Sequence, residues 1–202
     1  MLCTHLVASA QGTAAGTAAI SGIPYVDEKY IDGVIYYGDK TLATSIRYNA
    51  YQDLIEYTQN GKAVVLDPSL TLKRVKFGTS TYVTQEYKAG GKTKVGYFQV
   101  LDSGKLTLLA KQKIIYLPAK KQGNLDGTDQ VAQFKRSPDV YFYKIESGAL
   151  QEVDNIKSMI ETIPDKQEEL TQFAKKEKIS PRKEKEMIQF VQYYNSLTST
   201  NQ

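Results

Sequence analysis

The feature that most constrains the fold is an apolar, β-favouring stretch between residues 95 and 117. Two runs within it, residues 95–101 and 105–110, are separated by Asp102-Ser103-Gly104. Asp and Ser side chains bond to nearby backbone and Gly adopts positive φ, so this tripeptide favours a tight reversal. The pattern predicts an antiparallel hairpin at the centre of a sheet, whose second strand runs on through residues 114–117 until Pro118.

Turn signals divide the residues before this hairpin into further short strands. Asn60-Gly61 accepts the positive φ of a type I′ turn, so it predicts a hairpin between residues 52–58 and 63–66. The apolar side chains change parity within residues 70–77, which indicates a bulge near Lys73-Arg74. Further strands are expected at residues 31–37, 41–48, 81–87 and 140–145.

Short strands at this spacing predict an antiparallel, strongly curved β-meander, either a sandwich or a half-open barrel. Residues 120–139 interrupt it, because they are polar and contain Gly123, Gly127 and Pro138. We expect a long loop there, with at most a short strand at residues 131–134.

The apolar period changes from two to about 3.6 after Val153, which indicates helices. Asp154 or Asn155 is expected to cap the first helix, and Pro164 to end it. Its apolar stripe consists of Ile156, Met159, Ile160 and Ile163. The complete pattern therefore predicts an α+β protein, in which helices follow the sheet and cover part of it.

Two more helices are expected before the chain ends. Asp165 and Glu168 have the spacing of a capping box for the second helix. Ser180-Pro181 has the pattern of an N-cap followed by Pro at the first helical position of the third. The inward residues are Leu170, Phe173 and Ala174 in the second helix and Met187, Ile188, Val191, Tyr194 and Leu197 in the third.

The N-terminus has the features of an export signal. Ala8-Ser9-Ala10 supplies the small residues that signal peptidase reads, although no Lys or Arg precedes Lys29, so we expect the basic start of the signal to lie further upstream. Cleavage after Ala10 removes Cys3 and His5, the only Cys and His of the chain. This excludes disulfides, thiol nucleophiles and His general bases from the mature protein.

The predicted organisation has five parts. They are a signal-peptide remnant at residues 1–10, a flexible segment at 11–23, an antiparallel sheet domain at 24–153, a three-helix segment packed on the sheet at 154–197 and a frayed tail at 198–202. No stretch reaches the ~20 apolar residues of a transmembrane helix, so none is expected.

No motif in the chain identifies a reaction, and we predict no catalytic, cofactor-binding or metal-ligating residue. A loop around Gly127 is rich in the oxygen ligands that calcium prefers: Asn124, Asp126, Thr128 and Asp129. An EF-hand loop beginning at Asn124 would need Glu where Lys135 stands. An ordinary polar turn is therefore expected, with no metal or other cofactor.

Positive charge is concentrated in the second half of the predicted sheet. The basic residues there are Lys62, Lys73, Arg74, Lys76, Lys88, Lys92, Lys94, Lys105, Lys111, Lys113, Lys120 and Lys121, against Asp67, Glu86 and Asp102. A basic side of this kind attracts anionic partners such as lipid head groups or acidic glycans, although a merely solvating surface stays open. Lys predominates over Arg, and Lys lacks the bidentate geometry with which Arg recognises phosphate, which disfavours nucleic acid as a partner. The expected export of the protein disfavours it as well.

Three segments carry a loose resemblance to known proteins: Ala8-Ser9-Ala10-Gln11, the hairpin from Gly96-Tyr97-Phe98 to Gly104-Lys105-Leu106, and the helices from Asp165-Lys166 to Tyr193-Tyr194-Asn195-Ser196-Leu197. In these the chain resembles an uncharacterised secreted or envelope protein family of Bacteroidota. The resemblance implies export to the periplasm or cell exterior and assigns no residue a function.

The function expected from these observations is an exported, noncatalytic binding or interaction module whose partner is a protein, a lipid or an anionic glycan. One alternative is a carrier that holds an apolar, lipid-like ligand inside a half-open barrel. A second alternative is a hydrolase that uses Asp or Glu carboxylates.

Overall fold

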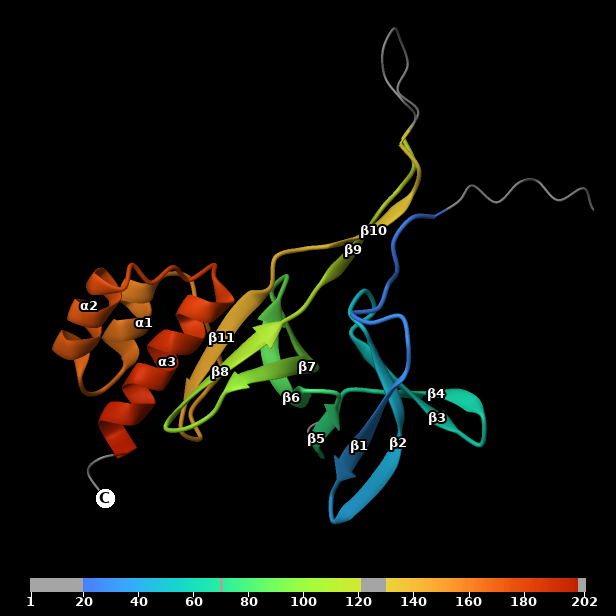
Figure 1. Ribbon diagram of the computed structural model, residues 1–202, viewed down its shortest axis with the longest axis horizontal. Helices are drawn as coiled ribbons and strands as arrows, with labels where there is room; N and C mark the ends of the chain where they lie inside the picture. The colour runs from blue at the N-terminus through green and yellow to red at the C-terminus, as the bar shows by residue number, and fades with distance from the viewer. Residues whose placement is uncertain (1–19, 70, 121–129, 200–202) are drawn as a thin grey trace, which may run out of the picture.

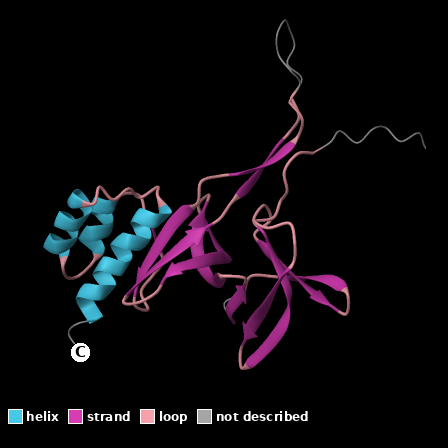
Figure 2. Cartoon of the chain, viewed as in Figure 1, coloured by secondary structure: helices cyan, strands magenta, loops and turns pink. Residues whose placement is uncertain are grey.

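The structure is a computed structural model that describes residues 20–69, 71–120 and 130–199. Over these residues the chain forms a ten-stranded sheet, a separate two-stranded ribbon and three C-terminal helices (Figure 1, Figure 2). Neighbouring strands of the large sheet are antiparallel and the sheet curls into a half-barrel. The predicted fold class, a curved antiparallel meander followed by three helices, is confirmed.

The large sheet follows the chain as a meander with two departures, β5 beside β1 and β11 beside β8. Its spatial order is β12 (Gln151–Glu152), β11 (Val140–Ile145), β8 (Leu106–Lys111), β7 (Lys92–Asp102), β6 (Ser80–Ala89), β5 (Leu72–Phe77), β1 (Ile31–Tyr37), β2 (Lys40–Asn49), β3 (Leu54–Gln59) and β4 (Lys62–Leu66). The central hairpin predicted around Asp102-Ser103-Gly104 is therefore confirmed as β7–β8.

Two bulges bend this sheet. Between β1 and β5, Tyr36 pairs with Arg74 and Tyr37 with Leu72, so Lys73 is the extra residue. This confirms the bulge expected near Lys73-Arg74. The second bulge lies in β7 at Leu101, where the β7–β8 register shifts. Bulges increase local twist and bend a strand, which accounts for much of the curl.

The continuation of the second central strand needs correction. Residues 114–117 do form a strand, β9 (Ile114–Leu117), but it pairs with β10 (Gln133–Arg136) and this ribbon projects from the sheet (Figure 1). Beyond Gln112, whose buried amide accepts from Tyr82 Oη and donates to Gln99 Oε1, the backbone bonds partners outside the β8 ladder, because Ile114 N donates to Ala50 O and Lys113 O accepts from Ser137 N. The short strand expected at residues 131–134 lies two residues later.

The N-terminal segment is described from Ile20 onward. Ser21 donates its N–H to Ala132 O and accepts a hydrogen bond from Phe134 N, both at 2.9 Å. Ser21, which the sequence assigns to a flexible segment, is thus bonded to the chain beside and within β10. The rest of the predicted flexible segment and the predicted signal remnant lie outside the described residues.

Tyrosine fills the inside of the curl. Tyr48 lies 5.1 Å from Tyr82 and 6.1 Å from Tyr97, measured between ring centroids. All three are at most 1% exposed, and their hydroxyls donate to Asp53, Gln112 and Leu66 O respectively. The aliphatic and aromatic residues packed with them are Ile35, Ile46, Ala50, Ile55, Leu72, Val75, Phe77 and Ile114.

The helices pack on one face of β8 and β11. They are α1 (Ile156–Thr162), α2 (Gln167–Lys176) and α3 (Glu184–Ser199). Leu108 and Tyr143 of the sheet join one core with Met159 of α1, Leu170 of α2 and Val191 of α3. The predicted stripe of α1 is buried as expected, and Asn155 caps this helix by accepting a hydrogen bond from Ser158 N at 2.8 Å.

The predicted starts of α2 and α3 are wrong. Asp165 does not cap α2, because its carboxylate accepts hydrogen bonds from Tyr194 Oη at 2.8 Å and Lys105 Nζ at 3.1 Å, and Lys166 takes the N-cap position with φ 61°. The third helix begins at Glu184 and not at Pro181. Ser180 instead starts a turn, in which its backbone N–H donates to Glu186 Oε2 at 2.8 Å.

Asn195 of α3 fastens the helix layer to β8. Its Oδ1 accepts a hydrogen bond from Leu106 N and its Nδ2 donates to Leu106 O, both at 2.9 Å. The amide therefore bonds both backbone groups of one strand residue, as a neighbouring strand would. This places the helix segment in direct contact with the sheet on which it was expected to pack.

Candidate functional site

A pocket of about 440 Å³ lies beside the point where β8 leaves the sheet. Side chains alternate between the faces of a strand, so Lys111 and Leu109 point away from the helices that cover Leu108 and Ala110. The pocket is lined by Ala50, Tyr51, Gln52, Asp53, Tyr87, Lys88, Ala89, Lys94, Lys111, Gln112, Lys113, Val140, Phe142 and Glu152. It therefore joins the β2–β3 turn, the β6–β7 hairpin and the ends of β8 and β11.

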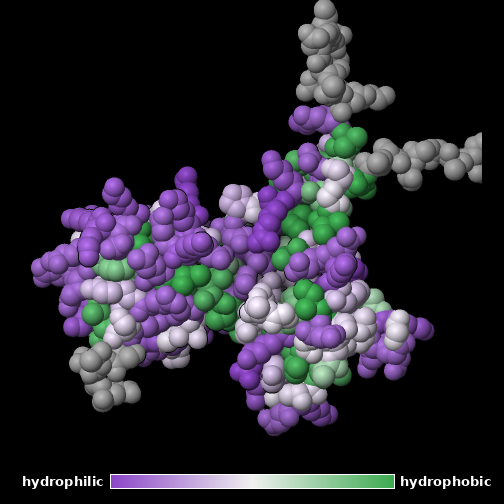
Figure 3. Space-filling model, in the orientation of Figure 1, coloured by the Kyte–Doolittle hydropathy of each residue, from purple (hydrophilic) through white to green (hydrophobic). Residues whose placement is uncertain are grey.

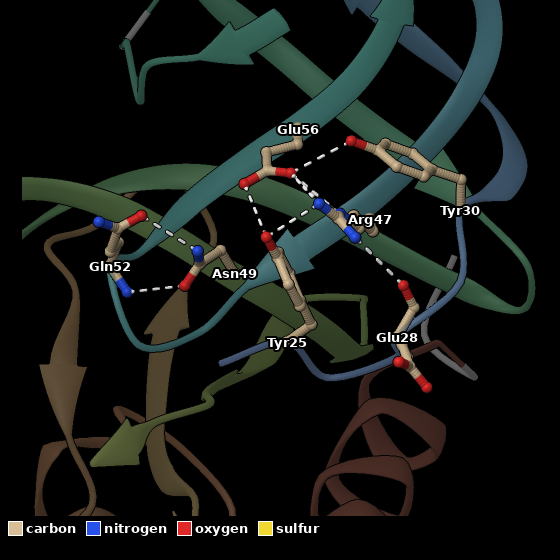
Figure 4. A network of polar contacts seen from close by, with 7 residues as sticks. All are labelled: Tyr25, Glu28, Tyr30, Arg47, Asn49, Gln52 and Glu56. Carbon is tan, nitrogen blue, oxygen red and sulfur yellow. Dashed lines mark hydrogen bonds and ion pairs between the residues drawn. The ribbon is translucent and has the colours of Figure 1, made fainter. Parts of the chain in front are cut away.

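The β2–β3 turn holds one wall of the pocket in place. Buried Asn49 donates to Gln52 Oε1 at 3.1 Å and accepts from Gln52 N at 3.0 Å (Figure 4). Ala50 O accepts a hydrogen bond from Ile114 N at 3.3 Å, which ties the turn to the start of β9. Asp53 follows with φ 59°, a left-handed conformation that only a well-determined surrounding maintains in a residue other than glycine.

Asp53 and Lys111 form an ion pair at the floor of the pocket, with Oδ2 and Nζ 2.5 Å apart. The other carboxylate oxygen, Oδ1, accepts hydrogen bonds from Tyr48 Oη at 2.7 Å and Tyr97 N at 3.3 Å. Lys111 Nζ also donates to Tyr97 O at 2.9 Å. Both members of the pair are mostly buried, and each has several partners that hold its orientation.

Aromatic rings surround the Lys111 ammonium group. Its Nζ lies 5.0 Å from the ring centroid of Tyr87 and 4.8 Å from that of Phe98, within range of cation–π attraction. Burial lowers the pKa of Lys111 from its ordinary value, while the neighbouring carboxylate of Asp53 acts in the opposite direction. Burial also raises the pKa of the Tyr87 hydroxyl, with Asp53 as the second cause.

Gly96 makes room for this arrangement. A side chain at position 96 would collide with Asp53 Oδ2, Lys111 Nζ and the ring of Tyr87. The φ of Gly96 is not in the left-handed region, so backbone conformation does not explain the glycine. The close approach of three side chains does.

A second hollow of about 560 Å³ adjoins the first and shares Tyr87, Lys88, Phe142 and Glu152 with it. Its other lining residues are Gln85, Glu86, Thr93, Gly148, Ala149 and Leu150. Together the two hollows, here called the paired pocket, form a groove with an aromatic middle. Most of its lysines line the smaller hollow, and Gln85 and Thr93 line the larger one.

A separate polar cluster lies on the outer surface of β2 and β3. The Arg47 guanidinium packs between the rings of Tyr25 and Tyr30, 3.8 and 4.3 Å from their centroids (Figure 4). It donates to Glu56 Oε2 through Nε at 2.9 Å and Nη2 at 2.7 Å, and to Glu28 O at 3.3 Å. Its donors are used within the protein, so this cluster fastens residues 25–30 to the sheet.

The structure brings some of the residues noted in the sequence together and places others apart. Of the basic residues noted in the sequence, Lys88, Lys94, Lys111 and Lys113 meet at the paired pocket. Others lie elsewhere, for example Lys105 against Asp165. The calcium-like loop residues Asn124, Asp126, Thr128 and Asp129, together with Cys3 and His5, lie outside the described residues. No pattern in the sequence assigns a role to Asp53.

No protein-family model, curated protein or solved structure matches the chain. The resemblance to envelope proteins of Bacteroidota therefore stays a prediction. In the part of the chain that the structure describes, no helix is long and apolar enough to cross a membrane.

Proposed function

We propose that this protein is a noncatalytic binding module whose paired pocket holds an acidic glycan. The observation that carries the proposal is that four lysines from three separate segments, Lys88, Lys94, Lys111 and Lys113, line the smaller hollow together with Tyr87. Cationic groups attract the carboxylate or sulfate of such a glycan. The half-buried, amphipathic ring of Tyr87 offers a face to the C–H side of a sugar ring, and Gln85 and Thr93 offer partners for its hydroxyls.

The charges of the paired pocket favour an anion at one end only. The lining of the smaller hollow contains Lys88, Lys94, Lys111 and Lys113 against Asp53 and Glu152. Because Asp53 is paired with Lys111, the other three lysines supply most of the field that a ligand meets. The larger hollow contains Lys88 against Glu86 and Glu152, which suits a neutral part of the same glycan.

The absence of a catalytic role is part of the proposal. Hydrolysis by paired carboxylates needs one group that is free to transfer a proton. Both oxygens of Asp53 accept hydrogen bonds or an ion pair from Tyr48, Tyr97 and Lys111. This supports a positioning role for Asp53 rather than acid–base chemistry.

The alternative of an apolar ligand enclosed by the half-barrel has less support. Tyr48, Tyr82 and Tyr97 occupy the inside of the curl and are almost fully buried. Their hydroxyl groups have partners within the protein. A ligand that filled this interior would have to displace these bonded side chains.

Export to the periplasm or cell exterior, where acidic glycans occur, is also proposed. Its support is the Ala8-Ser9-Ala10 pattern of the sequence. Fractionation of the parent cell with N-terminal sequencing tests it. Protein that begins near Gln11 outside the cytoplasm agrees with the proposal, and cytoplasmic protein with intact Met1 contradicts it.

Isothermal titration with an oligogalacturonate tests the binding function. We expect one site, with affinity that falls as salt is added, and no binding of the neutral methyl ester. Lys88→Ala combined with Lys94→Ala is expected to weaken binding by at least about tenfold. The matched control is Lys73→Ala with Lys76→Ala, which removes the same charge from exposed positions of β5. An equal loss of affinity in the two double variants would show that binding depends only on the net charge of the protein. That result would contradict the paired pocket as the binding site.

A further inference from the structure

A second pocket lies where two hairpins of the sheet diverge. Residues 40–46 of β2 pair with β1, whereas residues 46–49 pair with β3, so that only Ile46 has both strands as neighbours. The β1–β2 and β3–β4 hairpins therefore separate beyond Ile46. Thr44 Oγ1 donates to Thr58 O at 2.6 Å and closes the inner end of the gap. Figure 3 shows apolar and neutral surface between the two hairpins.

The pocket between these hairpins, here called the notch, has a volume of about 390 Å³. It is lined by Ile35, Tyr37, Lys40, Thr41, Leu42, Tyr57 and Leu66. This volume lies near the lower end of the range for small-molecule pockets, roughly 300 to 1,000 Å³. Tyr37 and Leu42 are 50% and 41% exposed, so the apolar wall meets solvent.

Charge in the notch has one sign. Lys40 is its only charged lining residue, and no carboxylate contributes to the wall. Within residues 20–69, 71–120 and 130–199, Lys40 has no ion pair. The Tyr37 hydroxyl already accepts a hydrogen bond from Thr71 Oγ1 at 3.0 Å. The notch thus offers an apolar wall with one cationic group at its rim.

We propose that the notch binds a single-chain amphiphile with an anionic head group, such as a fatty-acid carboxylate. The acyl chain lies against Leu42, Tyr57 and Leu66, and the carboxylate pairs with Lys40. Burial of methylene groups drives binding and outweighs the cost of association. The charge at the rim then selects the carboxylate over a cationic head group.

A protein partner fits the notch less well. A stable interface covers about 800 Å² on each partner and is apolar at its centre. The hairpin tips that flank the notch are polar instead, at Gly38-Asp39-Lys40 and Asn60-Gly61-Lys62. A slender chain enters between these tips without burying their charges.

This site differs from the paired pocket, with which it shares no lining residue. Its test therefore stands apart from the test of glycan binding. Titration of the full chain with dodecanoate, below its micelle concentration, is the direct measurement. We expect one bound molecule per chain and weaker binding of dodecyltrimethylammonium, which has the same chain length and the opposite charge.

Two substitutions separate the contributions of the wall and the rim. Leu42→Gln is expected to weaken dodecanoate binding by at least about tenfold, and Lys40→Gln to remove the preference for the anionic head group. Val65→Gln is the matched control, because Val65 is 51% exposed and does not line the notch. Thermal melts of each variant confirm that it is folded.

Three results would overturn the proposal. The first is wild-type protein that binds no dodecanoate. The second is equal weakening by Leu42→Gln and Val65→Gln, which indicates nonspecific adsorption. The third is concentration-dependent dimerisation in analytical ultracentrifugation that Leu42→Gln abolishes, which assigns the notch to a second copy of the chain.

Discussion

Asp53 and Lys111 complete the backbone hydrogen bonding of Tyr97, at the point where β7 loses β8 as its neighbour. Tyr97 N donates to Asp53 Oδ1 at 3.3 Å, and Tyr97 O accepts from Lys111 Nζ at 2.9 Å. The two side chains thus satisfy both backbone groups that a neighbouring strand residue would otherwise bond. Because Asp53 lies in the β2–β3 turn, the same pair ties opposite ends of the curled sheet together.

Removal of Asp53 is expected to destabilise the protein more than a surface substitution does. Asp53→Ala removes the ion-pair partner of Lys111 and the acceptor of Tyr97 N and Tyr48 Oη. Loss of one partner of a buried pair costs about 3 to 5 kcal/mol, and partial exposure of this pair lowers the expectation to about 2 to 3 kcal/mol. Urea denaturation measures the difference.

The matched control for Asp53→Ala is Asp39→Ala. Asp39 forms an ion pair with Lys73 at 3.5 Å, and both side chains are exposed. Such pairs contribute less than about 1 kcal/mol. Similar costs for the two substitutions would show that the Asp53–Lys111 pair is only a surface contact.

Stability is expected to fall steeply above pH 10. Burial raises the pKa of Tyr48, Tyr82 and Tyr97 above the ordinary value of 10.0, so above pH 10 the unfolded chain releases protons that the folded chain retains. Each such tyrosine lowers the free energy of unfolding by up to about 1.4 kcal/mol per pH unit there. Lys111, with its lowered pKa, acts in the opposite direction but is a single group.

Denaturant melts between pH 8 and 11 measure this loss of stability. The buried tyrosine hydroxyls contribute fully to the free energy of unfolding below pH 10, and they no longer contribute once they ionise in the folded state. Tyr97→Phe is expected to flatten the decline, because the variant has one buried hydroxyl fewer to retain its proton. The control is Tyr116→Phe, at a ring that is 39% exposed. A flat profile in the wild type would contradict the buried tyrosine core.

Leu108→Ala is expected to cost about 2 to 5 kcal/mol. Leu108 is fully buried in the core that β8 shares with the helices, and truncation leaves a cavity there. Denaturant melts provide the measurement, with exposed Val65→Ala as the control. A change below about 1 kcal/mol would show that β8 is not the central packed strand.

A chain that ends at Gln151 is expected to aggregate or to lose its cooperative melt. This truncation uncovers Leu106, Leu108 and Tyr143, and it removes Asn195 from the backbone of Leu106. Short amphipathic helices with single apolar stripes are marginal alone in water. Circular dichroism and size-exclusion chromatography decide the outcome. A folded, monomeric fragment would show that the helices form an independent domain.

Local sequence patterns predict the turns, the strands and the bulge of this fold, because these features depend on residues that are adjacent in sequence. Two continuous apolar runs on either side of Asp102-Ser103-Gly104 mark the central hairpin, and the parity change near Lys73 marks the bulge. Asp165 shows where such reasoning fails. Its spacing to Glu168 suits a cap, but Tyr194 and Lys105 offer its carboxylate tertiary partners instead.

The candidate site could not be predicted, because its parts are far apart in sequence. Asp53 and Lys111 are 58 positions apart and meet only after the sheet has curled. The one local signal is a charged residue, Lys111, directly after the buried run that ends at Ala110. The notch likewise depends on how two hairpins diverge, which neither hairpin sequence encodes alone.

The most direct test of glycan binding is a titration of ¹⁵N-labelled protein with oligogalacturonate, followed by amide chemical shifts. The account predicts saturable shifts at the paired pocket, centred on Tyr87, Lys94 and the residues after Lys111, with none around Leu42 and Leu66. Unchanged spectra, or shifts confined to other surfaces, would contradict the paired pocket as the binding site.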